Sequence, residues 1–190
     1  MDAWLRERPW SAFWCYVAMV FATVPFARDV VLTLRNTNLL GAAVIALYAV
    51  AVAFVVYHVF FDLRHADWIA FVVVAALISV IAALLLGLEV PEERVHFLQY
   101  GLMGLLGRRA LAGPAAEREA ALRAIALAFA LGSVLGLLDE VLQGIVPSRV
   151  FDWRDVALNA VATGIALALD ELLHDRLRLR ARRPLQGAGR

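Results

Sequence analysis

The sequence predicts an all-α protein: a polytopic membrane helical bundle of about six transmembrane helices, with a polar pocket near the outer face. Of the 190 residues, 63% are hydrophobic, whereas a soluble domain has about half, and the mean hydropathy is +0.75. Apolar segments of about 20 residues, the length of a helix that crosses a bilayer, recur along the chain. Carboxylates interrupt the later segments, and such groups at membrane depth usually face a protein interior or a cavity.

Six membrane spans are expected. The first three are apolar almost throughout, whereas the fourth has an uncharged core, 95–107, of only 13 residues and also fits a re-entrant or interfacial segment. Gly144 and Pro147 break the helical pattern between the last two spans. In chain order, the spans lie at about 10–27, 39–61, 68–90 and 94–111, then from near Arg123 through Asp139 and Glu140, and at about 152–173.

The composition divides the chain into three parts. Residues 1–67 form an N-terminal two-helix membrane segment, residues 68–175 a membrane core, and residues 176–190 an Arg-rich cytoplasmic tail. Cys15 is the single cysteine, so an internal disulfide is excluded and a metal site built from cysteines is disfavoured. The net charge of +1 gives no electrostatic footprint for nucleic acid.

The distribution of arginine predicts the topology. All 18 basic residues are Arg, and basic residues in short loops favour the cytoplasmic side of a membrane. With both termini in the cytoplasm, six spans place 13 of these residues inside and 5 outside, and 13 plus 5 accounts for all 18. The chain is therefore expected in the cell membrane as a multi-pass protein with cytoplasmic termini.

Reporter fusions test this topology. A fusion after Gly113 and a fusion after Arg190 are both expected to report the cytoplasm, because the arginines that flank these positions resist translocation. A fusion after Arg149, between the last two spans, is the control and is expected to report the outside. An external signal at Arg190 contradicts the six-span topology.

One face of the fourth span carries a possible titratable site. Glu92, His96 and Tyr100 are spaced at i, i+4 and i+8, so they share this face. A His positioned by a carboxylate serves as a metal ligand or a proton carrier. Glu92 also follows Pro91, and an acidic residue suits the first turn of any helix, so both interpretations of Glu92 stay open. His96 and Tyr100, inside the apolar stretch, favour a functional role.

The fifth span carries two adjacent carboxylates. Asp139 and Glu140, with Gln143 beside them, lie at membrane depth, where charged groups mark functional sites. The alternative is a buried ion pair with Arg149, although such a pair is weak evidence for stability. Arg149 follows the break at Pro147, and its planar guanidinium suits a carboxylate or a phosphate.

Three polar residues open the sixth span. Asp152 also fits an N-cap, and Asp155 also fits an acidic residue of the first helical turn. Asp155 and Asn159, at i and i+4, continue one face into the membrane. A buried Asn needs hydrogen-bond partners, which the carboxylates of the fifth span and His96 are expected to supply. The polar residues of the three spans are therefore predicted to converge in one cavity.

These motifs resemble those of the VanZ-like membrane protein family. The segment PEERVHFLQYGLMGLL carries the acid, His and Tyr, and LLDEVLQGIVPSRVFDWRDVALNAVATG carries the Asp-Glu pair, Gln, Pro, Arg, two Asp and Asn. The resemblance covers about 92–164 and identifies 68–175 as a VanZ-like core. The namesake of the family is linked to teicoplanin resistance, so the resemblance implies a cell-envelope protein that affects glycopeptide susceptibility, that is, antibiotic resistance.

The favoured function is binding of an anionic lipid-linked or cell-wall group in the outward pocket, with Arg149 as the anion contact. A divalent cation is the candidate cofactor, because hard cations take carboxylate oxygens. Its candidate ligands are His96, Asp139, Glu140 and Asp155. Two alternatives stay open: an intramembrane, metal-assisted lipid-phosphate hydrolase or transferase, and a proton-coupled transporter. No complete catalytic signature is present, so turnover and catalytic residues stay unassigned. The expected partners are the lipid bilayer and either a lipid-linked cell-wall precursor or an anionic lipid headgroup, not nucleic acid.

Overall fold

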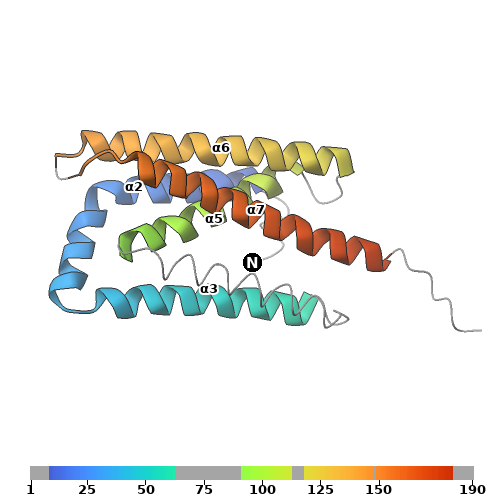
Figure 1. The fold of residues 1–190 in the computed structure, drawn as a ribbon, viewed down its shortest axis with the longest axis horizontal. Coiled ribbons are helices and arrows are strands. Elements are labelled where there is room, and N and C mark those ends of the chain that lie inside the picture. The colour runs from blue at the N-terminus through green and yellow to red at the C-terminus, as the bar shows by residue number, and fades with distance from the viewer. Residues whose placement is uncertain (1–8, 63–90, 113–117, 148, 182–190) are drawn as a thin grey trace, which may run out of the picture.

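A computed structural model of the chain describes residues 9–62, 91–112, 118–147 and 149–181 (Figure 1). Every regular element within these ranges is a helix, which confirms the all-α class for the described residues. The predicted third span, 68–90, lies outside them. The five helices are α2 (Pro9–Asn36), α3 (Leu40–Asp62), α5 (Pro91–Ala112), α6 (Arg118–Ile145) and α7 (Trp153–Ala181).

Two helices of the described part, α2 and α6, are long and apolar enough to cross a membrane. The fourth expected span is the continuous helix α5, 22 residues long. The helix α7 has 29 residues and extends to Ala181, beyond the predicted end near Leu173. The count of six spans stays a prediction.

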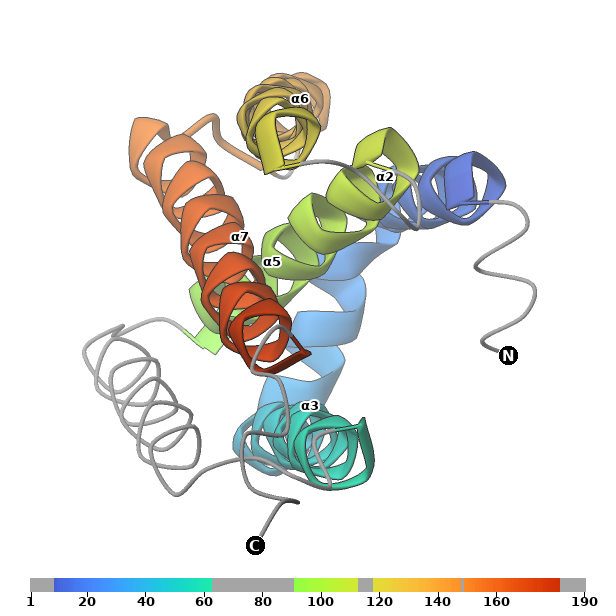
Figure 2. The same ribbon diagram turned by 90° about the vertical axis from the view of Figure 1, so that its right-hand side faces the viewer.

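The helix α5 lies at the centre of the described bundle. The view along the bundle in Figure 2 shows α6, α7, α2 and α3 arranged around it, and α5 contacts all four. The helices α6 and α7 are antiparallel, because Gly132 of α6 approaches Thr163 of α7 and Gly136 approaches Asn159. Since α5 is antiparallel to α6 as well, α5 and α7 begin at the same end of the bundle, where α6 ends.

The helix α2 bends and runs nine residues past its predicted end at Ala27. Figure 1 shows its second half crossing the end of the bundle toward α3. Pro25 lies inside the helix, and a proline removes one backbone hydrogen bond and kinks a helix without always ending it. The helix ends at Asn36, and two residues later Asn38 has a left-handed φ of 56°. The amide of Leu39 donates to the carbonyl of Leu34 at 2.8 Å, as in a Schellman cap.

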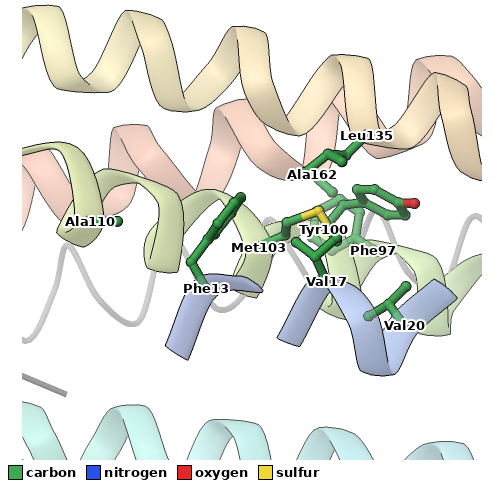
Figure 3. Close-up of a cluster of buried hydrophobic side chains, with 9 residues drawn as sticks. All are labelled: Phe13, Val17, Val20, Phe97, Tyr100, Met103, Ala110, Leu135 and Ala162. Atoms are coloured by element: carbon green, nitrogen blue, oxygen red, sulfur yellow. The ribbon is translucent and has the colours of Figure 1, made fainter. Parts of the chain in front are cut away.

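The hydrophobic core joins the N-terminal segment to the later helices. Figure 3 shows Phe13 and Val17 of α2 packed against Met103 and Tyr100 of α5. Phe13, Tyr100 and Met103 are at most 1% exposed, and burying a side chain of this size stabilises by about 1.5–3 kcal/mol. The helix α2 thus belongs to the same packing unit as the residues of the two polar motifs.

Small residues let α5, α6 and α7 approach closely. Thr163 of α7, fully buried, fits between Gly104 of α5 and Gly132 of α6. A Cβ added at Gly104 would lie 2.9 Å from Thr163 Cγ2, and one added at Gly132 would lie 2.8 Å from it. The Thr163 hydroxyl donates to the carbonyls of Asn159 and Tyr100, at 2.9 and 3.2 Å. Small residues at helix contacts of this kind are typical of membrane bundles.

A buried ion pair joins α5 to α7 at the opposite end from the polar motifs. The guanidinium of Arg108 donates to the carboxylates of Asp170 and Glu171, and the Arg108 side chain is only 7% exposed. The pair between Arg123 and Glu119 on α6 has side chains 76% and 78% exposed. Removing one partner of a buried pair costs about 3–5 kcal/mol, whereas an exposed pair contributes about 0–1 kcal/mol. Arg108 therefore fixes the register of α5 on α7.

Substitution of Gly104 tests the close approach. Gly104→Ala is expected to lower the free energy of unfolding by about 1–3 kcal/mol, because the added methyl overpacks against Thr163. Adding Thr163→Ser, which removes Cγ2, should recover part of that loss. Gly41→Ala, where nothing lies within 4 Å of the added Cβ, is the control and should be neutral or slightly stabilising. Thermal unfolding in detergent measures all three, and equal effects at Gly104 and Gly41 would contradict the packing argument.

Candidate functional site

The polar motifs meet at the end of the bundle where α5 and α7 begin and α6 ends. His96 lies in the second turn of α5, Asp139 and Glu140 lie near the end of α6, and Asn159 lies in the second turn of α7. We call the residues gathered here the polar cluster: His96, Tyr100, Asp139, Glu140, Gln143, Arg149, Asp155 and Asn159.

Three titratable groups lie at the centre of the polar cluster. One ligand atom from each of His96, Asp139 and Glu140 lies within 4.8 Å of the other two. Asp139 is 2% exposed and Glu140 is 0% exposed. The His96 ring stacks on the ring of Tyr100, with centroids 6.3 Å apart. Two antiparallel helices thus bring together two buried carboxylates and a half-buried imidazole, the residue types that bind metals or carry protons.

Gln143 orients the two carboxylates. Its Nε2 group donates to Asp139 Oδ2 and to Glu140 Oε1, at 3.2 Å each. Glu140 Oε2 accepts a further hydrogen bond from the backbone amide of Asp152, at 3.3 Å. This last bond ties the connection between α6 and α7 down onto the end of α6.

Asp152 is the N-cap of α7. Its Oδ1 accepts from the amide of Arg154 at 2.8 Å, which satisfies a donor that the first helical turn leaves free. Its side chain is exposed, so the structural interpretation accounts for this residue. Asp155, half-buried, lies close enough to His96 and Arg149 to interact with both electrostatically.

Arg149 lies beside the carboxylates without pairing with them directly. Its charge acts on both Glu140 and Asp155. Among the described residues it makes no direct ion pair with Asp139 or Glu140, so the geometry does not support a buried ion pair as the reason for these two carboxylates. The charge of two buried carboxylates is left without a contacting cation in the described part of the chain.

Several buried polar atoms of the polar cluster lack a hydrogen-bond partner among the described residues. Tyr100 and Asn159 are both 0% exposed, and Figure 3 shows the Tyr100 hydroxyl pointing away from Ala110 and the apolar cluster. That hydroxyl lies near Asp139 but outside hydrogen-bonding geometry. Buried polar atoms are nearly always paired, so each exception needs an explanation. The unpartnered atoms are His96 Nδ1, Tyr100 Oη, Asp139 Oδ1, Arg149 Nε, Asn159 Oδ1 and Asn159 Nδ2.

Two tyrosines of the N-terminal helices support the site, and sequence patterns did not indicate them. The hydroxyl of Tyr16 on α2 donates to the carbonyl of Gln99 at 3.2 Å, and the hydroxyl of Tyr48 on α3 donates to the carbonyl of Arg94. Both acceptors flank His96 on α5. The available signal was a tyrosine inside an apolar helix, whose hydroxyl needs a partner when buried. The Glu92 side chain lies outside the described residues, so its predicted place beside His96 stays a prediction.

Comparison with known proteins leaves the family open. No protein-family model, no curated protein and no solved structure matches the chain. The resemblance to VanZ-like proteins therefore stays a prediction, and any functional assignment rests on the polar cluster itself.

Asp139→Asn separates folding from function. The change keeps the shape and removes a buried charge that no cation of the described residues contacts, so with a chelator present we expect unchanged or higher thermal stability in detergent. Glu119→Gln, an exposed carboxylate on the same helix, is the control and should change stability by less than about 0.5 kcal/mol. A loss of about 3–5 kcal/mol in Asp139→Asn would instead show that the carboxylate pairs with a buried cation such as Arg149.

Proposed function

We propose that the chain is a VanZ-like, multi-pass protein of the bacterial cell membrane that binds an anionic group, of a lipid headgroup or a lipid-linked cell-wall precursor, at the polar cluster. One observation carries this proposal. Buried polar atoms from three helices converge beside Arg149 without hydrogen-bond partners in the described part of the chain, and there the Arg149 guanidinium makes no direct ion pair with the buried carboxylates. A bound ligand that forms hydrogen bonds with those atoms explains why they are buried together.

The surface of α6 supports the membrane location. Large apolar side chains on it are exposed over most of its length, although this helix also carries the buried Asp139 and Glu140. A surface so apolar is costly in water and suits a hydrocarbon environment. Its exposed side chains include Leu122, Leu127, Phe129, Val134, Leu138 and Val141.

The six-span topology places the polar cluster near the outer face. Both termini are then cytoplasmic, and α6 leaves the membrane where Gly144 and Pro147 end the helix. The connection between α6 and α7 then faces outward, so a ligand reaches Arg149 from the outer side of the membrane rather than from the cytoplasm.

Arg149 is the group suited to the anion. A guanidinium binds phosphate or carboxylate through two parallel hydrogen bonds. It lies on the short connection between α6 and α7, which the bond from the Asp152 amide to Glu140 holds in place. A phosphate at this position meets a positive charge before it meets the carboxylates beneath.

A second function, metal-assisted hydrolysis or transfer of a lipid phosphate, is favoured by one specific observation. The ligand atoms of His96, Asp139 and Glu140 are gathered within 4.8 Å, and a metal next to a bound phosphate polarises its oxygens. Release of product from a lipid phosphate distinguishes this function from binding alone.

Lipid binding tests the proposal. Full-length protein in detergent is expected to bind short-chain phosphatidic acid more tightly than phosphatidylcholine, by tryptophan fluorescence or calorimetry. Arg149→Gln should weaken binding of phosphatidic acid about tenfold or more, because it removes a charge-assisted hydrogen bond. Arg109→Gln, an exposed arginine at the other end of α5, is the matched control. Equal binding of both lipids, or no effect of Arg149→Gln, would refute anion binding at this site.

A further inference from the structure

We infer that His96, Asp139 and Glu140 bind one divalent metal ion of the zinc or manganese class, held at the centre of the polar cluster. This deepens the proposed function and rests on it in one respect: the metal would be a second contact for the anion beside Arg149. The ligand set itself follows from the side chains of α5 and α6.

The three ligand atoms are close to the geometry of a metal site. They lie within 4.8 Å of one another, whereas a metal bonded at about 2.0–2.2 Å holds its ligand atoms about 3–3.5 Å apart. Small rotations of the side chains close that gap. The helices α5 and α6 are closely packed here, because Gly136 of α6 admits Asn159 and the edge of the Tyr100 ring at close range.

Buried polar atoms without a hydrogen-bond partner among the described residues point to a bound ligand. They are the hydroxyl of Tyr100, a residue that is 0% exposed and lies near Asp139, together with His96 Nδ1 and Asp139 Oδ1. An unpaired buried polar atom carries its full desolvation penalty. A metal with its bound water supplies a partner for each of these atoms at one point in space.

The charge balance favours a cation. Asp139 and Glu140 are both buried, and neither is in a direct ion pair with Arg149 in the described part of the chain. A dication neutralises two carboxylates at the point where they converge. Gln143 donates to one oxygen of each carboxylate, which is how surrounding hydrogen bonds commonly orient carboxylate ligands.

The donor set selects the class of metal. One imidazole nitrogen with two carboxylates favours zinc or manganese over magnesium or calcium, which prefer oxygen ligands alone. Three protein ligands leave at least one coordination position open, as in sites where the metal contacts a substrate; purely structural sites have no open position. Asp155 is not among the three gathered groups, although it lies close enough to His96 and Arg149 to interact with both electrostatically.

Metal binding by the full-length protein tests the inference. Chelator-treated protein in detergent is titrated with Zn²⁺ by calorimetry, and its metal content is then measured by mass spectrometry. We expect one Zn²⁺ per chain, bound more tightly than Mg²⁺. Asp139→Asn and His96→Gln should each weaken binding at least tenfold, and Tyr100→Phe should weaken it about tenfold while keeping the stoichiometry. Glu119→Gln is the carboxylate control and should bind as the wild type does.

X-ray absorption of the zinc-loaded wild type identifies the zinc ligands directly, so the site can be tested even where a variant fails to fold. One imidazole nitrogen among oxygen ligands is expected, and a zinc shell without imidazole overturns the site. No zinc uptake, or equal uptake by the wild type and the folded variants, also overturns it and leaves water as the occupant. Phosphatidic acid binding measured both with and without zinc separates the two proposals: lipid binding by a protein that takes up no zinc refutes only the metal, and zinc binding by a protein that binds no lipid under either condition refutes only the anion.

Discussion

The close approach of α5, α6 and α7 is the constraint on which the site depends. Thr163 fills the space between Gly104 and Gly132, and Asn159 lies against Gly136 one turn nearer the polar end. No larger residue fits at these glycines without a shift of the helices. The contact sets the separation of α5 from α6, and with it the distance of His96 from the two carboxylates.

The bundle is held differently at its two ends. At one end the buried guanidinium of Arg108 is paired with the carboxylates of both Asp170 and Glu171. At the other end Asp139 and Glu140 converge on His96 with buried atoms left unpaired among the described residues. If Asp139 and Glu140 served only to stabilise the fold, we would expect each to be paired with an opposite charge, as Asp170 and Glu171 are with Arg108. The second end has the features of a binding site, because its unpaired atoms cost stability unless a ligand contacts them.

The N-terminal helices are part of this arrangement. Phe13 of α2 packs beside Gly107 of α5, and the hydroxyls of Tyr16 and Tyr48 hold α5 carbonyls on either side of His96. A helix with a strongly polar face is thereby fixed in rotation by hydrogen bonds from two directions. Since His96 and Tyr100 lie on that face, α2 and α3 control how both rings point.

The sequence by itself determined the helical class, most helix positions and the identity of the polar residues, because apolar length and i, i+4 spacing are local properties of the chain. It also indicated that Asp152 could cap α7, which local hydrogen bonding confirms. It could not determine that α2 continues past Ala27, since tertiary contacts decide whether a helix kinked at a proline ends. Only the tertiary structure brought His96 within 4.8 Å of Asp139 and Glu140 and left Arg149 out of a direct ion pair with them. The first of these distances depends on how α5 packs against α6, and the second on how the chain turns after α6; the spacing of residues along one helix predicts neither.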